Sequence, residues 1–146
     1  MNIPDPAHII ASLKAQTKKE ALIELAGLFQ DIDQENLVRT LLDRESLGST
    51  AIITGMALPH AKISIIDEIL IAIGRSKAGI HWNARDGQPV HLIFLMIAPK
   101  SAASSYRQTL SGLSRVLKNN SHCALLHSAK DQTEIHRILQ DCLQSP

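Results

Sequence analysis

The chain has 146 residues, 45% of them hydrophobic and only 3% aromatic, and its 15 Lys and Arg side chains nearly balance its 14 Asp and Glu side chains. This length predicts one domain, residues 1–146, whose folding removes about two-thirds of the unfolded chain's surface from water. Because charges of both signs are interspersed, no basic stripe indicates nucleic-acid binding, and we expect protein or small-molecule partners instead.

The N-terminal segment and the cysteines indicate the compartment. Residues 1–20 lack the basic-then-apolar order of a signal peptide, and no apolar run approaches the ~20 residues needed to span a bilayer. Cys123 and Cys142 are too few for a metal-binding knuckle, so the sequence predicts free thiols, buried or half-buried, in a reducing cytosol. We therefore expect a cytoplasmic protein without membrane insertion.

Two helices are predicted in the first third of the chain. Thr17 and Glu20 have the spacing of a capping box, and the helix that they open is expected to end near Ile32. Its apolar face consists of Ala21, Leu22, Leu25, Leu28 and Phe29. Asp33 caps the second helix, which delivers Arg44 at its C-terminal end. The apolar positions of the second helix are Leu37, Val38, Leu41 and Leu42.

Two nearly continuous apolar runs follow, at residues 69–73 and 90–98. Runs of this kind are typical of strands covered on both faces, so we expect them to be the central strands of a sheet. Low aromatic content and many aliphatic residues agree with an α/β protein. The sequence therefore predicts an α/β fold: a single domain with a mixed β-sheet flanked by helices on both faces.

Three helices are predicted after Pro99. The first has Tyr106 in its first turn, where free backbone N–H groups favour an anion. Its apolar face consists of Leu110, Leu113, Val116 and Leu117, and its candidate N-caps are Ser101, Ser104 and Ser105. A short helix is expected at residues 121–127. Residues 131–134 cap the last helix, whose apolar positions are Ile135, Ile138, Leu139 and Leu143.

The surroundings of His60 are suited to phosphoryl chemistry. Pro59 fixes its own φ and forces the preceding residue into an extended conformation, so the imidazole follows a stiff corner of the backbone. Arg44 supplies a forked cation, and Ser49 and Thr50 supply small hydroxyls for a phosphate-sized anion. Considered alone, His60 could equally be a structural histidine in a turn. Arg44 alone could equally be a solvated cation at the end of a helix.

The other histidines do not predict a metal site. No pair among the seven histidines has the i, i+4 spacing that places two ligands on one face of a helix. The surface, a strand end or a helix is the expected place for His81, His91, His122, His127 and His136. A metal-binding module is therefore a poorly supported alternative.

Residues 44–62, taken as an ordered set, resemble the enzyme IIA domain of the bacterial phosphoenolpyruvate-dependent phosphotransferase system, fructose/mannitol type. In that family an Arg-Glu-x-Leu-x-Ser/Thr-Thr segment leads through a glycine-containing turn to a phosphorylated histidine in a Pro-His-Gly-Lys or Pro-His-Gly-Thr motif. Here the segments read Arg44-Glu45-Ser46-Leu47-Gly48-Ser49-Thr50 and Pro59-His60-Ala61-Lys62. A second family-like segment at residues 82–90 extends the resemblance to nearly the whole chain.

The resemblance implies a phosphocarrier. His60 would accept a phosphoryl group from a histidine-containing phosphocarrier protein of the general or the nitrogen branch, and Arg44 with Ser49 and Thr50 would neutralise the phosphoryl oxygens. Lys62 stands where sugar-transporting members usually carry Thr, so the chain looks most similar to the stand-alone nitrogen-regulatory IIA protein. Downstream regulatory proteins are then the implied targets. Because such transfer relies on positioning and electrostatics, no metal or cofactor is expected.

Two positions depart from the family pattern. Ala61 replaces the usual glycine, and Tyr106 stands where the family typically places a second active-site histidine. The Tyr106 hydroxyl can donate to a phosphoryl oxygen, but it cannot replace an imidazole as acceptor or cation. Two alternatives therefore stay open: a non-phosphorylated regulatory binding protein of the same fold, and a sugar-branch (fructose/mannitol) IIA component.

Overall fold

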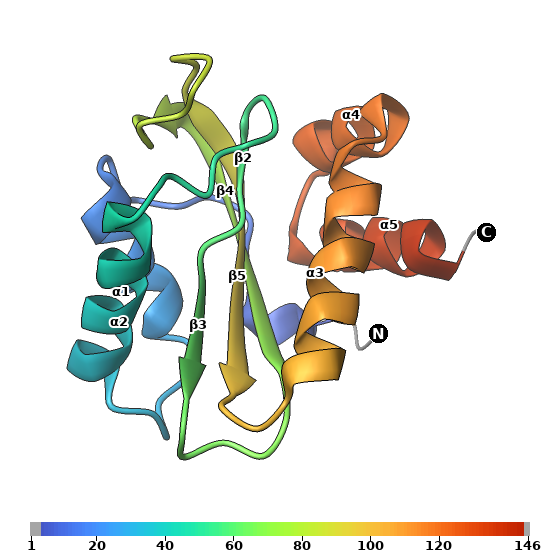
Figure 1. The fold of residues 1–146 in the computed structure, drawn as a ribbon. Helices are drawn as coiled ribbons and strands as arrows, with labels where there is room; N and C mark the ends of the chain where they lie inside the picture. The colour runs from blue at the N-terminus through green and yellow to red at the C-terminus, as the bar shows by residue number, and fades with distance from the viewer. Residues whose placement is uncertain (1–3, 145–146) are drawn as a thin grey trace.

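The computed structural model describes residues 4–144. They form a five-stranded mixed sheet with helices on both faces (Figure 1). The elements in chain order are the 3-10 turn η1 (Pro6–His8), β1 (Ile9–Ile10), α1 (Lys18–Ala26), α2 (Gln34–Ser46), β2 (Met56–Ala57), β3 (His60–Ile63), β4 (Leu70–Ile80), β5 (Val90–Pro99), α3 (Ala103–Leu117), α4 (Asn120–Ser128) and α5 (Gln132–Gln144). The predicted fold class is confirmed.

The sheet is organised around β5. β4 pairs with β5 in antiparallel register, with Ile73 opposite Phe94, and β1 adds to β4 in parallel. On its other edge β5 pairs in parallel with two short strands placed end to end, β2 opposite Leu92 and Ile93 and β3 opposite residues 96–99. The predicted central strands at residues 69–73 and 90–98 are confirmed as β4 and β5.

Alternate residues of β5 contribute to two separate cores. Ile93, Leu95 and Ile97 pack with residues of α1 and α2, and their neighbours Leu92, Phe94 and Met96 pack with residues of α3 and α5. Because side chains alternate across a strand, a strand covered on both faces must be apolar at every position. Figure 1 shows the same arrangement, with α1 and α2 on one side of the sheet and α3, α4 and α5 on the other.

The first helix is shorter than predicted. α1 ends at Ala26, with Gly27 as its C-cap, rather than near Ile32. Glycine is a poor helix former, and the chain continues through i→i+3 turns that still bury Phe29 and Ile32. The predicted start is confirmed, because the Thr17 hydroxyl accepts a hydrogen bond from the Glu20 N–H at 3.1 Å.

The other helix starts are confirmed with one exception. Asp33 accepts from the Asn36 N–H at 3.2 Å, and Asp131 accepts from the Glu134 N–H at 2.9 Å. The expected short helix is α4. The serine caps proposed for α3 are wrong, because its N-cap is Ala102 and no side chain bonds the first turn.

The states of the two thiols are as predicted from the cysteine count. Both cysteines are free, Cys142 buried and Cys123 half-buried, and burial raises the pKa of each thiol. Within residues 4–144, none of the helices has the length and the apolar character that crossing a membrane requires.

Candidate functional site: the His60 corner

His60 lies where the edge of the sheet is interrupted. The segment Leu58-Pro59 separates β2 from β3, and Pro59 is tolerated there because an edge strand can lack an N–H donor. The Leu58 N–H bonds the Thr50 carbonyl at 3.3 Å, and the Pro59 carbonyl accepts from the Met96 N–H at 2.9 Å. These bonds fix the backbone on both sides of the corner from which the imidazole extends.

One nitrogen of the His60 ring is already engaged. Nδ1 lies 2.7 Å from the Leu58 carbonyl oxygen. Because a carbonyl oxygen only accepts hydrogen bonds, Nδ1 must carry the proton, and the lone pair of a neutral ring is then on Nε2. The backbone therefore selects the tautomer that presents Nε2 as a nucleophile.

The environment of His60 favours the neutral ring. Burial lowers the pKa of His60 below its ordinary value of 6.5; the Leu58 hydrogen bond raises it, the Arg44 charge lowers it and the Glu45 charge raises it. Burial dominates, and the net shift is downward. At neutral pH the imidazole is thus unprotonated on Nε2, as a nucleophile must be.

Arg44 is placed as the sequence predicts. It lies in the last turn of α2, and its guanidinium donates to the Gly48 carbonyl at 2.8 Å. Its charge lowers the pKa of both His60 and Tyr106, so the guanidinium is within electrostatic reach of both side chains. Burial has the larger effect on Tyr106, whose pKa is raised overall.

Tyr106 and Lys62 complete the surroundings of His60. The Tyr106 and His60 ring centroids are 5.8 Å apart in an edge-on arrangement, and Lys62 Nζ lies 4.5 Å from the Tyr106 centroid. His60 and Lys62 share one face of β3, whereas Ala61 lies in the opposite core. Among residues 4–144, only Asn83 is a non-glycine residue with positive φ, so Ala61 needs no conformation reserved for glycine.

The hydroxyls of Ser49 and Thr50 are engaged within the protein. Ser49 Oγ donates to the Trp82 carbonyl at 2.8 Å and accepts from the Ala51 N–H at 3.1 Å. Thr50 is 4% exposed, and its hydroxyl donates to the Glu45 carboxylate. The structure brings together His60, Arg44 and Tyr106; the phosphate-binding role of Ser49 and Thr50 stays a prediction.

Two residues of this region had no role assigned from the sequence. Lys62 had been used only to distinguish family branches, and Glu45 only as part of a motif. Glu45 carried a usable signal, because an acidic residue in the last turn of a helix opposes the helix dipole and needs compensation. Nothing in the sequence spacing could show that Lys62 packs on Tyr106, since they are far apart in the chain.

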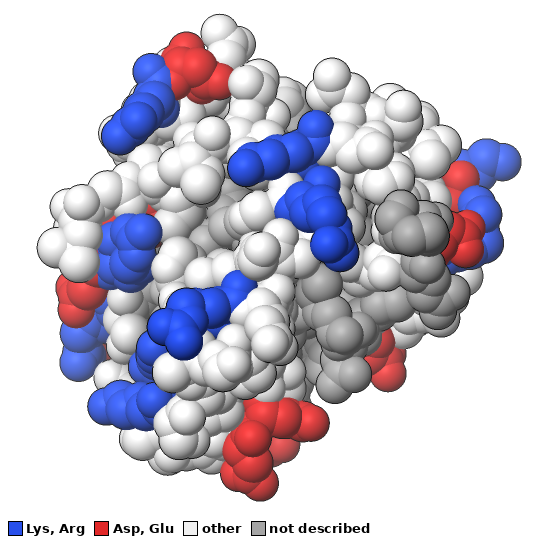
Figure 2. Space-filling view, turned by 45° about the vertical axis from the view of Figure 1, so that its right-hand side comes forward, with Lys and Arg blue, Asp and Glu red and all other residues white. Residues whose placement is uncertain are grey.

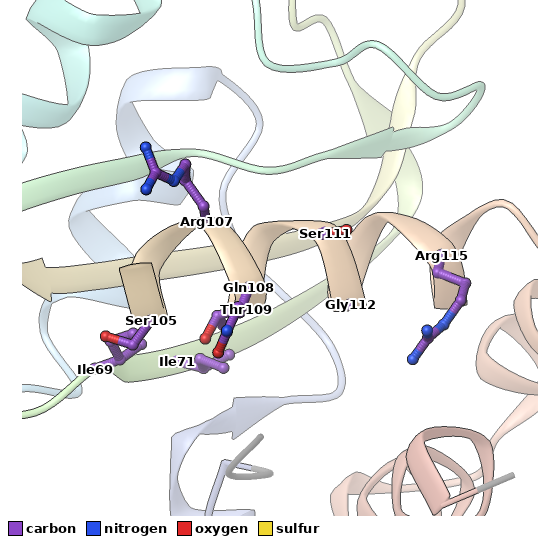
Figure 3. A pocket seen from close by; sticks show the side chains of 9 residues that line it. All are labelled: Ile69, Ile71, Ser105, Arg107, Gln108, Thr109, Ser111, Gly112 and Arg115. Atoms are coloured by element: carbon purple, nitrogen blue, oxygen red, sulfur yellow. The ribbon is translucent and has the colours of Figure 1, made fainter. Parts of the chain in front are cut away.

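A separate groove runs between α3 and the start of β4. It is lined by Ile69, Ile71, Ser105, Arg107, Gln108, Thr109, Ser111, Gly112 and Arg115. Figure 3 shows Ser105 and Thr109 on the same side of α3 as the two isoleucines, with the Arg107 side chain extending the other way. Neither His60 nor Tyr106 lines this groove, so it is distinct from the His60 corner.

The charge and the metal-binding potential of the surface limit the chemistry. In Figure 2 the middle of the displayed face carries Lys and Arg side chains, and the Asp and Glu side chains lie towards its margins. Among residues 4–144, no group of three or more His, Cys, Asp or Glu side chains could hold a metal ion. At the His60 corner itself, the Arg44 guanidinium and the Lys62 ammonium are the cations that could bind an anion.

Comparison with known proteins defines the class. Residues 2–142 match the family described as phosphoenolpyruvate-dependent sugar phosphotransferase system, EIIA 2. The chain belongs to this enzyme IIA family.

Within the family, the chain is similar to nitrogen regulatory proteins. It is 34% identical to the nitrogen regulatory protein of Bradyrhizobium diazoefficiens, over 92% of this chain and 90% of that protein. The crystal structure of nitrogen regulatory protein IIA-Ntr from Neisseria meningitidis superposes with a TM-score of 0.89 at 27% identity, covering 94% and 96% of the two chains. A Bacillus subtilis fructose-specific EIIABC component is 36% identical over 73% of this chain and 17% of its own length.

Proposed function

We propose that the chain, residues 1–146 as a single IIA domain, accepts a phosphoryl group on Nε2 of His60 and serves as a phosphocarrier of the nitrogen-regulatory branch. The donor is a histidine-containing phosphocarrier protein, of the nitrogen branch or the general one. Downstream regulatory proteins read the phosphorylation state. This assignment places the protein in the cytoplasm, where such carriers work.

The observation that carries the proposal is a combination at His60: Nδ1 lies 2.7 Å from the Leu58 carbonyl, and the ring is within reach of the Arg44 charge and next to Tyr106. The Leu58 contact holds the ring in one tautomer and directs the Nε2 lone pair away from the backbone. Reaction in line with a donor phosphorus requires a fixed nucleophile, and most of the catalysis in phosphoryl transfer comes from positioning and charge. A merely structural histidine would not need its second nitrogen left available beside a cation.

The charges around His60 support the same chemistry. The Arg44 guanidinium is a planar fork that matches two phosphoryl oxygens, and the Tyr106 hydroxyl offers a neutral donor. A raised pKa keeps the Tyr106 hydroxyl protonated, and therefore a donor, at neutral pH. Lys62 adds a second cation on the same face of β3 as His60.

The transfer step conserves atoms and charge. The Nε2 lone pair forms the new N–P bond, and the N–P bond of the donor histidine breaks with its electron pair staying on the donor nitrogen. A donor ring protonated on its other nitrogen leaves as a neutral imidazole. The His60 ring then carries one positive charge, and its Nδ1–H remains bonded to the Leu58 carbonyl.

Labelled phosphoenolpyruvate with each of the two carrier systems tests the proposal. We expect acid-labile phosphate on the full chain, and we expect His60→Ala to abolish it. His91→Ala is the matched control, because His91 is also a half-buried strand histidine, with Nδ1 2.9 Å from the Ser76 carbonyl. Label that persists in His60→Ala and maps to another histidine would show that the site is wrong.

The same experiment separates the alternatives. Replacement of the family's second histidine by Tyr106 favours a second candidate, a regulatory binding protein of the same fold that is never phosphorylated. Absence of label with both carrier systems, from a chain that is folded, would support that candidate. Transfer of label onward to a sugar-specific IIB protein would instead support a fructose/mannitol component.

A further inference from the structure

Glu45 occupies a position that is unfavourable for a carboxylate in two ways. It lies in the last turn of α2, where the negative end of the helix dipole repels an anion. Its side chain is only 3% exposed, so the charge is also removed from water. A buried carboxylate at this end of a helix needs strong local hydrogen-bond partners. Those partners show which segments Glu45 connects.

Within residues 4–144, Glu45 accepts three hydrogen bonds, and two of them come from one residue. The carboxylate accepts from the Thr50 N–H at 3.1 Å and also from the Thr50 hydroxyl. The third bond comes from the Lys18 ammonium, at 3.3 Å, which also lies 5.5 Å from the centroid of the Trp82 ring. Glu45 thereby joins the start of α1 and the end of α2 to the loop that leads to His60.

The bonds continue without a break from Thr50 to the imidazole. The Thr50 carbonyl accepts from the Leu58 N–H at 3.3 Å, and the Leu58 carbonyl faces His60 Nδ1 at 2.7 Å. The Leu58 residue is therefore bonded on both sides, to the loop through its N–H and to the ring through its oxygen. Through its bond to the Leu58 N–H, Thr50 helps to fix the carbonyl that lies against His60 Nδ1.

We propose that Glu45 is a positioning residue for phosphoryl transfer: by fixing Thr50, it holds the Leu58 carbonyl that keeps His60 in the Nδ1–H tautomer. The inference rests on the proposed function of His60. Glu45 itself touches no reacting atom, and it acts through Thr50 and Leu58. Its negative charge additionally raises the pKa of His60 and so opposes the effect of Arg44.

The primary test is Glu45→Gln in the full chain labelled with ¹⁵N. The ¹⁵N shifts of the His60 ring report the tautomer, and single-turnover transfer from a phosphorylated carrier reports the rate. We expect the Nε2–H tautomer to appear and the rate at saturating donor to fall by about tenfold to a hundredfold, because small misplacements of a reacting group are costly. The concentration of carrier that gives half the maximal rate should not change.

Glu24→Gln is the matched control. Glu24 also accepts backbone hydrogen bonds, from the N–H groups of Lys14 at 3.1 Å and Ala15 at 3.0 Å, but it belongs to α1 and has no link to Leu58. Its replacement should leave the His60 tautomer and the transfer rate unchanged. Thr50→Val removes the hydroxyl bond to Glu45 and keeps the N–H bond, so it should change the tautomer and the rate in the same direction but by less; it is the second variant if Glu45→Gln does not fold.

The outcomes are distinct. If Glu45→Gln folds and keeps the parental tautomer and rate, the positioning role is overturned and Glu45 is a structural residue. If Glu45→Gln does not fold, a parental tautomer and rate in Thr50→Val overturn the positioning role. Failure of the parent protein itself to take up label refutes the proposed function instead, and the ¹⁵N tautomer measurement, which needs no phosphate, still decides whether Glu45 orients the ring.

Discussion

Two histidines of this molecule make the same kind of backbone contact but have different neighbouring side chains. His60 and His91 are both half-buried strand residues, and each has Nδ1 against a backbone carbonyl, at 2.7 and 2.9 Å. The neighbour of His60 is Tyr106, at 5.8 Å between centroids, whereas the neighbour of His91 is another histidine, His127, at 5.9 Å. The tautomer-selecting bond alone therefore does not define a phosphoryl site.

The arginine near each pair of rings explains the difference: Arg44 acts on His60 and Tyr106, and Arg75 acts on His127. Arg44 uses part of its guanidinium to hold the Gly48 carbonyl at the end of α2. Arg75 is 4% exposed and donates to the carbonyls of Ala11, Leu126, His127 and Ala129, so its guanidinium closes the end of α4 and joins it to β4. Within residues 4–144 no carboxylate pairs with Arg75. Arg44 is the arginine proposed to bind an anion, whereas Arg75 supports the fold.

The largest expected effect is on stability, from Arg75→Met. Loss of the guanidinium leaves several buried carbonyl groups without a donor, and we expect the free energy of unfolding to fall by about 3 kcal/mol. Urea denaturation measures the change. Arg39→Met is the control, because Arg39 is exposed and pairs with the exposed Glu35, and its loss should change stability by less than about 0.5 kcal/mol. A loss of under about 1 kcal/mol for Arg75→Met contradicts this role.

Arg44→Gln should have the opposite balance of effects, with a large loss of transfer rate and a small loss of stability. Removal of a preorganised charge beside the phosphoryl oxygens is expected to slow transfer to His60 about a hundredfold, with a loss of stability no larger than one surface hydrogen bond, about 1 kcal/mol. Single-turnover transfer and urea denaturation on the same sample separate the two effects. Arg39→Gln, also on α2, should leave the rate unchanged. An unchanged rate in Arg44→Gln itself refutes the proposed role.

Local patterns in the sequence were sufficient for the framework of the fold. The apolar runs of β4 and β5 and the caps at Thr17, Asp33 and Asp131 were predicted from the residues, because each depends on neighbours in the chain. The end of α1 was predicted six residues too far, since the buried Phe29 and Ile32 continue the apolar pattern beyond Gly27. Burial in turns looks the same in a sequence as burial in a helix.

The candidate site was less predictable because it depends on contacts between distant segments. His60 and Arg44 could be found from a compact motif. The packing of Lys62 on Tyr106 and the link from Glu45 through Thr50 to Leu58 depend on the sheet that brings these segments together. The engagement of the Ser49 hydroxyl by the Trp82 carbonyl was likewise invisible, because a hydroxyl in a loop has many possible partners.

The next prediction concerns Tyr106, the ring that lies next to His60 in place of the histidine that lies next to His91. Tyr106→Phe keeps the ring against His60 and Lys62 but removes the hydroxyl donor, so we expect transfer to slow about tenfold or more, the loss of about 1.5–3 kcal/mol for a bond to a charged oxygen. Tyr106→His restores the family pattern and should match or exceed the parent rate. If neither substitution changes single-turnover transfer, the site works without this residue.

The smallest expected effect concerns pH, and His60→Asn tests it. Burial lowers the pKa of His60 below 6.5 in the folded protein, whereas the unfolded chain titrates near its ordinary value of 6.5. Below pH 6.5 the unfolded state therefore binds more protons than the native state, and stability falls as the pH falls towards the native pKa. Above pH 6.5 this contribution to stability is complete.

His127, whose pKa burial also lowers, adds to the pH dependence of stability in the same direction. Urea denaturation at pH 7.5 and 5.5 should show a smaller loss of stability for His60→Asn than for the parent. Arg44→Gln removes a charge that lowers the pKa of His60, so an NMR titration of that variant should give a higher midpoint than the parent. Equal midpoints would place Arg44 too far from the ring to stabilise a phosphoryl group on it.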